Sequence, residues 1–232
     1  MCVVGHLRLA LDRIAICMVG QSKGANLANI SICILDYGSG NVQSVYNALK
    51  VLGIESVISN ESSDIKNASH LVLPGVGGFS ASMEKINNRL PLELIKLQLA
   101  KGKPFLGICV GMQVLGKIGY EFGETLGLGY FEGNIIRFPD SAFPIPHVGW
   151  NNVTYNAQSV LFQGMVDSPD FYFVHSYYLN IPINHVDVAA RTSYILEFPS
   201  SIEKDNVYGV QFHPEKSQKN GKILLRNFAK IQ

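Results

Sequence analysis

The feature that most constrains this chain is a glycine-bracketed cysteine at the end of an apolar run. Residues 103–113 read Lys-Pro-Phe-Leu-Gly-Ile-Cys-Val-Gly-Met-Gln, with Cys109 between Gly107 and Gly111. A strand that enters a helix through so tight a turn needs small residues on both sides, and it presents the central side chain above the sheet. The segment therefore predicts a nucleophile elbow built on sulfur. The adjacent helix N-terminus favours the thiolate, which is the reactive form of cysteine.

A second segment supplies the base that a cysteine nucleophile needs. Residues 207–217 read Val-Tyr-Gly-Val-Gln-Phe-His-Pro-Glu-Lys-Ser, so an apolar strand leads into His213, and Glu215 follows two residues later. An imidazole can take and return a proton at Cys109, while a carboxylate orients the ring from its other side. The two segments together predict a catalytic triad of Cys109, His213 and Glu215.

A third segment is a candidate for an oxyanion hole. Residues 71–79 read Leu-Val-Leu-Pro-Gly-Val-Gly-Gly-Phe, a strand that ends at Pro74 in a glycine-rich loop. Acyl transfer needs N–H donors where negative charge develops on oxygen. We expect the N–H of Val76 or Gly77 to act with that of Val110, the residue after the nucleophile. An ordinary strand-to-helix turn would have the same pattern.

The periodicity of the chain predicts its fold class. Apolar runs that suit buried strands alternate with helix-period patterns in the first half, and short β-rich runs follow from about residue 134. A final helix is expected after Ser217 as its N-cap, with an apolar face of Leu224, Leu225 and Phe228. We expect an α/β fold: a doubly wound, mostly parallel sheet extended by antiparallel strands. In the first half, strands are expected at 30–35, 70–73 and 105–108. Helices are expected at 41–52, 80–89 and 92–101.

Composition excludes several classes of function. With 232 residues the chain can form one domain with a sizeable core, and its net charge of +1 favours neither a nucleic-acid nor a membrane partner. The four cysteines show no C-x-x-C pair and no metal-ligand spacing, which predicts no metal site and suits a reducing cytosol. No apolar stretch approaches the roughly 20 residues that a transmembrane helix needs.

These segments, taken together, resemble the class I (triad) glutamine amidotransferases. Within that family the chain is most similar to the glutaminase subunits of imidazole glycerol phosphate synthase, the HisH family. The Cys109 and His-Pro-Glu segments are shared by all triad amidotransferases, whereas Asp-Tyr-Gly-x-Gly-Asn, Pro-His-Val-Gly-Trp-Asn and Val-His-Ser-Tyr are more particular to this subfamily. The matching segments run in order along the chain: 36–41 with Ser44 and Val45, then 73–79, 107–113, 146–151, 173–178 and 209–217.

The resemblance implies a reaction and a partner. The Cys109 thiolate would attack the side-chain amide of L-glutamine, His213 would move the proton to the leaving ammonia, and water would hydrolyse the thioester. The partner would be a (β/α)₈ barrel cyclase, which uses the ammonia to make imidazole glycerol phosphate and the aminoimidazole carboxamide nucleotide AICAR in histidine biosynthesis. We therefore expect a cytoplasmic heterodimer that needs no cofactor.

The resemblance also assigns further residues. The loop 116–120 differs from the acidic version usual in the family, and this weakens the assignment of Glu121, which follows it. The substrate-binding candidates are Gln113, Glu121, Ser176 and Tyr177. The candidates for the partner interface are Asn41, Trp150, Tyr172 and Lys216.

Three alternatives remain at this stage. Relatives of these subunits deliver ammonia for surface-sugar amidation, and the departures at Val110, 116–120 and 203–206 fit such a paralogue at least as well. A free-standing cysteine hydrolase could use the same elbow, but the intact segment 146–151 argues against it. A catalytically silent partner-binding relative is disfavoured because the three triad residues are all present.

The start of the chain forms a separate unit in this interpretation. The first buried strand is expected at residue 30, and the apolar residues before it are interrupted by Arg8, Asp12 and Arg13. A signal peptide would have a basic start and an unbroken apolar region, and neither is present. We expect residues 1–29 to form a non-catalytic extension, or else an added strand or helix, and residues 30–232 to form the amidotransferase domain.

Overall fold

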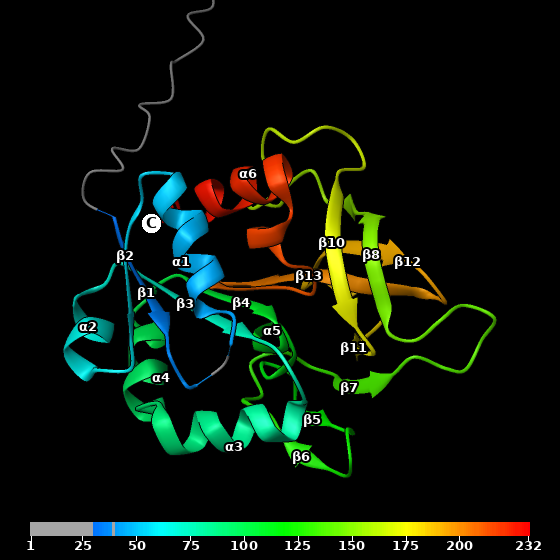
Figure 1. The fold of residues 1–232 in the computed structure, drawn as a ribbon, viewed down its shortest axis with the longest axis horizontal. Helices are drawn as coiled ribbons and strands as arrows, with labels where there is room; N and C mark the ends of the chain where they lie inside the picture. Colours follow the sequence, from blue (N-terminus) through cyan, green and yellow to red (C-terminus); the bar gives the residue numbers. More distant parts are fainter. Residues whose placement is uncertain (1–29, 39) are drawn as a thin grey trace, which may run out of the picture.

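The structure is a computed structural model that describes residues 30–38 and 40–232, so the expectation for residues 1–29 lies outside it. Its centre is an eight-stranded sheet with the order β2-β1-β3-β4-β14-β13-β12-β9 (Figure 1). The first five strands in this order run parallel to one another. Their bounds are β2 (Glu55–Ser59), β1 (Ser31–Leu35), β3 (His70–Gly75), β4 (Phe105–Cys109) and β14 (Val207–Val210).

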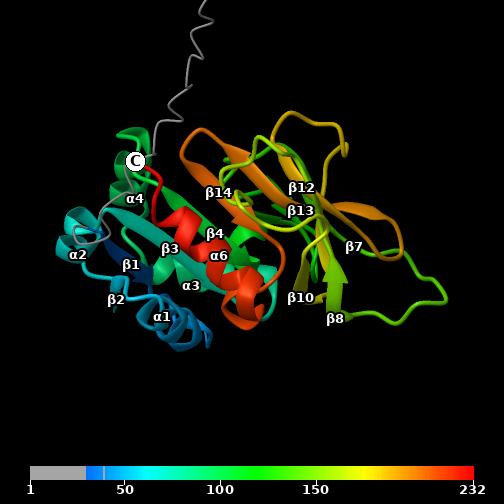
Figure 2. The ribbon, with the colours of Figure 1, turned by 90° about the horizontal axis from the view of Figure 1, so that it is seen from above.

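Helices cover both faces of this parallel region, which explains why its central strands are continuously apolar and buried. Figures 1 and 2 show α1 and α6 on one face and α3 and α4 on the other. Helix α1 ends before Gly53, whose φ of +70° is the left-handed conformation that glycine adopts readily. The bounds are α1 (Val42–Val51), α2 (Ser62–Asn67), α3 (Phe79–Arg89), α4 (Leu92–Ala100) and α6 (Gln218–Phe228).

Antiparallel strands extend the sheet and build a second region beside it, on the right in Figure 1. Strands β13 (Glu197–Lys204), β12 (Val188–Ser193) and β9 (Thr154–Tyr155) continue the main sheet beyond β14. A two-stranded sheet pairs β8 (His147–Asn152) with β10 (Asp170–His175). A four-stranded sheet contains β11 (Tyr177–Asn180), β7 (Asn134–Arg137), β5 (Ile118–Gly119) and β6 (Thr125–Leu126). The doubly wound sheet with added antiparallel strands is thus confirmed.

The final helix is confirmed, and Ser217 is its N-cap residue as expected, although its side chain makes no capping hydrogen bond. Leu224, Leu225 and Phe228 are completely buried against the sheet, as expected. The Ser217 hydroxyl instead donates to the carbonyl of His213 at 2.6 Å and accepts the N–H of Tyr172 at 3.0 Å. The hydroxyl of Ser217 therefore ties the segment after β14 to β10 and does not bond the backbone N–H groups of the helix.

Strands β2 and β13 were not expected from the sequence. Strand β13 contains Pro199 and two serines, and neither residue type favours a strand. Its central residues are nevertheless buried. Its pairing with β12 and β14 on either side outweighs these weak local preferences.

Candidate active site

Three neighbouring parallel strands deliver the three catalytic segments to one edge of the sheet. Gly75 at the end of β3 lies opposite Cys109 at the end of β4, and Val210 of β14 lies opposite Ile108. Since the carboxyl ends of parallel strands share one edge, ligands of such sheets bind there. The glycine-rich loop, the cysteine and the histidine segment therefore meet, although they are far apart in sequence.

The turn at Cys109 has the geometry of a nucleophile elbow. Cys109 has φ 56° and ψ −112°, a conformation that is costly for a residue with a side chain. A Cβ atom at Gly107 would collide with the carbonyl group of Gly111, and one at Gly111 would collide with that of Leu73. Only glycine fits at either position, so the reason given for both glycines in the sequence is confirmed. The short helix α5 (Val110–Gln113) starts directly after the cysteine.

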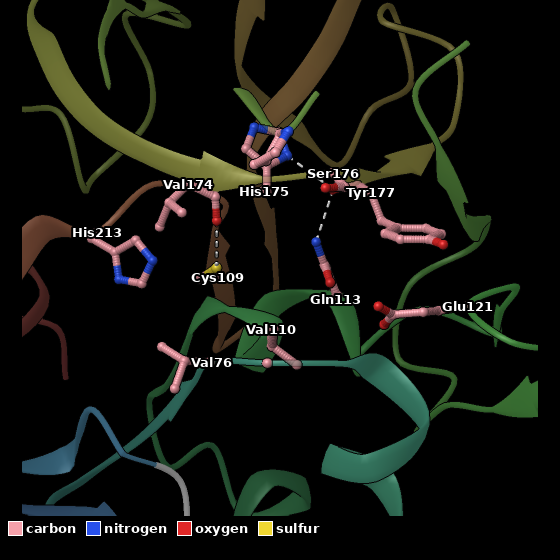
Figure 3. Close-up of a pocket in the computed structure, with 12 residues that line it drawn as sticks. Val76, Cys109, Val110, Gln113, Glu121, Val174, His175, Ser176, Tyr177 and His213 are labelled. Atoms are coloured by element: carbon pink, nitrogen blue, oxygen red, sulfur yellow. Dashed lines mark hydrogen bonds between the residues drawn. The ribbon is translucent and has the colours of Figure 1, made fainter. Parts of the chain in front are cut away.

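His213 and Glu215 form a buried pair beside the thiol. Their side chains are completely buried, and Nδ1 of His213 lies 2.7 Å from Oε1 of Glu215. Because a carboxylate can only accept, the proton of this hydrogen bond is on Nδ1 of the ring. Figure 3 shows the ring next to Cys109, at one end of the row of side chains that line the cavity. The geometry is that expected of a nucleophile, a base and an orienting carboxylate.

The surroundings of His213 favour its protonated form. Burial lowers the pKa of His213, but interactions with Cys109 and then Glu215 outweigh that effect and raise it to about 10. A histidine that remains charged at neutral pH stabilises a thiolate at Cys109 through the opposite charge. The pair is therefore suited to hold the proton that a leaving amine requires.

Asn41 belongs to this buried group. Its side-chain amide donates to Oε1 of Glu215 at 2.6 Å and lies 3.4 Å from Nδ1 of His213. Asn41 is only 5% exposed. Its amide is thus bonded inside the chain, and the contact of Asn41 with a partner stays a prediction. The direct effect of the Asn41 amide is to hold the carboxylate of Glu215 in place.

A cavity of about 390 Å³ opens in front of the thiol. It contains every predicted oxyanion and substrate residue, together with Cys109 and His213, whereas Glu215 lies behind His213. Its volume is within the range of small-molecule sites. The lining residues are Val76, Gly77, Cys109, Val110, Gln113, Glu121, Pro146, Val174, His175, Ser176, Tyr177 and His213.

Two side chains fix the polar end of the cavity, on the right in Figure 3. Glu121 accepts the N–H of Phe79 at 2.5 Å, at the first residue of α3, where a negative charge is stabilised by the helix. Gln113 donates from Nε2 to the carbonyl of Tyr177 at 2.9 Å. Glu121 thus places a carboxylate at the cavity although its preceding loop differs from the usual family version.

Besides its interaction with His213, the sulfur atom has polar contacts with two further described residues. Sγ of Cys109 lies 3.9 Å from the carbonyl oxygen of Val174, and it accepts a hydrogen bond from Nε2 of Gln211 at 3.7 Å. Gln211 is completely buried and was not among the residues singled out in the sequence. A signal was available, since Gln211 precedes His213 by two residues, the spacing that puts side chains on one side of an extended segment.

A second group of buried histidines lies close to the first. Nδ1 of His147 is 3.0 Å from Nε2 of His175, and Nδ1 of His175 donates to the carbonyl of Tyr177 at 2.9 Å. Asn151 donates to Nε2 of His147 at 3.2 Å. Burial lowers the pKa of His147 to about 4, and burial, with smaller effects from His147 and His213, lowers that of His175 to about 3. Both rings are therefore neutral, in a single fixed tautomeric arrangement.

The other three predicted interface residues form one cluster on the surface. Trp150 is 49% exposed and packs edge-on to Tyr172, with their ring centroids 6.1 Å apart. Lys216 lies on a short 3₁₀ helix, η2 (Pro214–Lys216), and its Nζ atom is 5.7 Å from the centre of the Tyr172 ring. The structure thus brings together an aromatic pair and a cation next to the segment that carries His213.

Within residues 30–38 and 40–232, no three His, Cys, Asp or Glu side chains gather in a way that could hold a metal ion. None of the helices in the same described part combines the length and apolar character needed to cross a membrane.

Comparison with known proteins places the whole described domain in one family of sequences. The family model described as "Glutamine amidotransferase class-I" matches residues 33–231. A protein of Caldanaerobacter subterraneus subsp. tengcongensis named "Imidazole glycerol phosphate synthase subunit HisH" is 44% identical over 200 residues, which cover 86% of this chain and 98% of that protein. A Campylobacter jejuni protein named "Imidazole glycerol phosphate synthase subunit HisH 1" is 41% identical over 86% of this chain and 100% of its own length.

Solved structures share the fold. One described as "Crystal structure of glutamine amidotransferase" has a TM-score of 0.68 at 19% identity, covering 86% of this chain and 97% of its own. Another, a glutamine amidotransferase from Thermotoga maritima, has a TM-score of 0.61 at 16% identity over 86% of this chain and 96% of its own. At these identities the likeness concerns the fold alone.

Proposed function

Because this chain belongs to the class-I glutamine amidotransferase family, we propose that it is the glutaminase subunit of an imidazole glycerol phosphate synthase. The observation that carries the proposal is the meeting of Cys109 and His213 at a single cavity, with Glu215 bonded behind the histidine. The 41–44% identity to proteins named as HisH subunits, over nearly their full length, supports the choice of pathway. We accordingly assign the chain to histidine biosynthesis.

In the proposed mechanism, the Cys109 thiolate attacks the side-chain carbonyl carbon of L-glutamine. The N–H groups of Val110 and of Val76 or Gly77 stabilise the oxyanion that forms. His213 gives its proton to the leaving nitrogen, so the carbon–nitrogen bond breaks and ammonia departs from a glutamyl thioester. His213 then takes a proton from water, which attacks the thioester to release glutamate and restore the thiolate.

The cavity matches the other end of a glutamine molecule. Both N–H groups of Gln113 are already donated inside the chain, so its amide offers a ligand only the oxygen. Together with the Glu121 carboxylate, that oxygen would accept hydrogen bonds from the substrate ammonium group. Ser176 and Tyr177, on the opposite wall, would lie along the substrate carboxylate.

We place the partner at the surface cluster of Trp150, Tyr172 and Lys216. Exposed aromatic residues and a cation are the types that anchor protein interfaces, and this cluster adjoins the segment of His213. The proposed partner is a (β/α)₈ barrel cyclase that receives the ammonia before solvent protonates it. Such a heterodimer would work in the cytoplasm, where the catalytic thiol stays reduced.

The proposal is tested by measuring glutamate release from the purified chain alone, with the barrel cyclase, and with cyclase plus its nucleotide acceptor. We expect slow hydrolysis alone and at least about 10²–10³-fold activation in the full mixture, the contribution of one oxyanion donor. The Cys109→Ala variant is the control, since it should retain synthesis from added ammonia. Failure of the full mixture to hydrolyse glutamine would contradict the proposal, as would activation only by a partner from surface-sugar amidation.

A further inference from the structure

The side-chain amide of Gln211 lies against the sulfur of the nucleophile, and it has a fixed orientation. Gln211 is 0% exposed, and its Nε2 atom is 3.7 Å from Sγ of Cys109. Its Oε1 atom is 3.0 Å from Nε2 of Gln113. The inference drawn below rests on the proposed glutaminase function, because it concerns the same thiol.

The direction of each hydrogen bond follows from a backbone carbonyl, which can only accept. The oxygen of Tyr177 accepts at 2.9 Å, so the atom of Gln113 that faces it is the nitrogen, Nε2. The second N–H of that nitrogen then reaches Gln211, and the Gln211 atom that receives it has to be the oxygen. The nitrogen of Gln211 is thereby turned toward Sγ. The amide chain therefore ends with an N–H donor on the sulfur.

We propose that Gln211 is a catalytic residue that stabilises the Cys109 thiolate through its Nε2–H group, and that Gln113 is the positioning residue that keeps this group on the sulfur. A hydrogen bond to an ionised acceptor is stronger than one to a neutral acceptor. The donor therefore favours the thiolate over the thiol. It complements the positive charge of His213 without taking part in proton transfer.

The contact with Val174 acts in the opposite sense. A thiol can donate its proton to the Val174 carbonyl, whereas a thiolate gains nothing from that oxygen at 3.9 Å. Without the Gln211 donor, the neutral thiol would keep its hydrogen bond to the Val174 carbonyl on β10. The thiolate would lose the hydrogen bond that it receives from Gln211. Gln211 thus offsets a backbone group that would otherwise favour the unreactive form of the nucleophile.

Few other ionisable groups face the sulfur. Among the described residues, the cavity around Cys109 contains His213 from the segment after β14, Glu121 from the loop after β5, His175 from β10 and Tyr177 from β11, with Glu215 behind His213. Burial keeps His175 neutral by lowering its pKa to about 3. Removing the Gln211 donor leaves all of these groups in place, so its effect on the thiol can be measured separately.

The test is the rate at which iodoacetamide alkylates Cys109 in the full-length chain, followed between pH 5 and 10 by site-resolved mass spectrometry. Iodoacetamide reacts with the thiolate and requires neither glutamine nor a partner. The Gln211→Met variant keeps an unbranched side chain but has no N–H. In this variant we expect the pH midpoint of the alkylation rate to rise by about one unit. That shift corresponds to a roughly tenfold slower alkylation below the midpoint.

Two further variants make the result specific. Gln113→Met should raise the midpoint in the same direction by a smaller amount, because Gln211 then loses the partner that orients it. Gln98→Met is the matched control, since Gln98 is also a buried glutamine, 8% exposed, but lies on α4; its midpoint should equal that of the wild type. If Gln211→Met does not fold, Gln211→Asn, whose shorter amide cannot keep both contacts, takes its place.

An unchanged midpoint in a folded Gln211 variant would overturn the inference, and so would an equal shift in Gln98→Met. This readout is independent of the proposed function. A wild-type chain that fails to hydrolyse glutamine with its partner would defeat the proposed function, while the alkylation profiles would still decide the role of Gln211.

Discussion

Two buried histidine sites near the thiol have opposite electrostatic properties. His213 is next to a thiol and a carboxylate, and its pKa is raised to about 10 despite its burial. His147 and His175 are bonded to each other, to an amide and to a backbone carbonyl, and burial lowers their pKa values to about 4 and about 3. The histidine side chain and its burial are common to both sites. The anionic neighbours alone determine which site carries charge.

The difference separates a catalytic role from a positioning role. The charged His213 can deliver a proton to a leaving group, whereas the neutral pair donates fixed hydrogen bonds. Through Nδ1, His175 holds the carbonyl of Tyr177, and the same carbonyl accepts from Gln113. The neutral pair therefore supports the wall of the cavity that faces the nucleophile. Each prediction below alters one site and measures the contrast with the other.

The largest effect is expected when the anion at the first site is removed. Cys109→Ala should lower glutamine hydrolysis by at least about 10⁴-fold, since no other thiol of the described residues lines the cavity. It should also lower the pKa of His213, because one of the two anionic groups that raise it is gone. Glutamate release measures the first effect, and an NMR titration of the His213 ring measures the second. Persistent hydrolysis by the variant would show that Cys109 is not the nucleophile.

A smaller and unequal pair of effects is expected at the other two triad residues. His213→Asn should reduce kcat by about 10²–10⁴-fold, the usual contribution of a general acid–base group. Glu215→Gln should reduce it less, because the carboxylate orients and stabilises the ring but does not transfer the proton. Steady-state glutaminase assays with the partner present would compare them. Negligible losses in both variants would be incompatible with a triad.

At the neutral site the expected effect is on stability. His147→Phe keeps a ring stacked on Tyr194, at 4.0 Å between centroids, but leaves the buried Nε2 of His175 without its donor. An unsatisfied buried polar group costs about 1–3 kcal/mol, so the free energy of unfolding should fall by that amount. Urea denaturation provides the measurement, with His185→Gln, a partly exposed histidine, as control. A variant as stable as the wild type would remove the structural role assigned to the pair.

A pH dependence of stability is also expected, with a separate cause on each side. The pKa of His213 lies above the usual 6.5, so its contribution is complete below pH 6.5 and is lost as pH rises toward 10. The pKa values of His147 and His175 lie below 6.5, so their contribution is complete above pH 6.5 and is lost as pH falls toward 4 and 3. Denaturation of the wild type should show both declines. His147→Phe should reduce only the decline of stability at low pH. A reduced decline at high pH in this variant would contradict the assignment.

The elbow, the meeting of the Cys109 and His213 segments, and the sheet were predictable because local patterns encode them. Steric crowding at Gly107 and Gly111 leaves only glycine, and that requirement is visible in the sequence. The apolar runs of the parallel strands also show directly which segments are buried. Once those strands are parallel, their order places Gly75, Cys109 and the start of the His213 segment at one edge.

The sequence by itself therefore determined which segments carry the proposed nucleophile and base, since each segment depends on residues that are adjacent in the chain. Only the tertiary structure decided that Asn41 bonds Glu215, that the hydroxyl of Ser217 bonds to β10 instead of the first turn of α6, and that Gln211 faces the sulfur. Each of these is a contact between segments that are distant in sequence, made by a polar side chain with several possible partners. Which partner it meets depends on how the strands and helices pack, because a buried polar group bonds to whatever donor or acceptor the packing brings within reach.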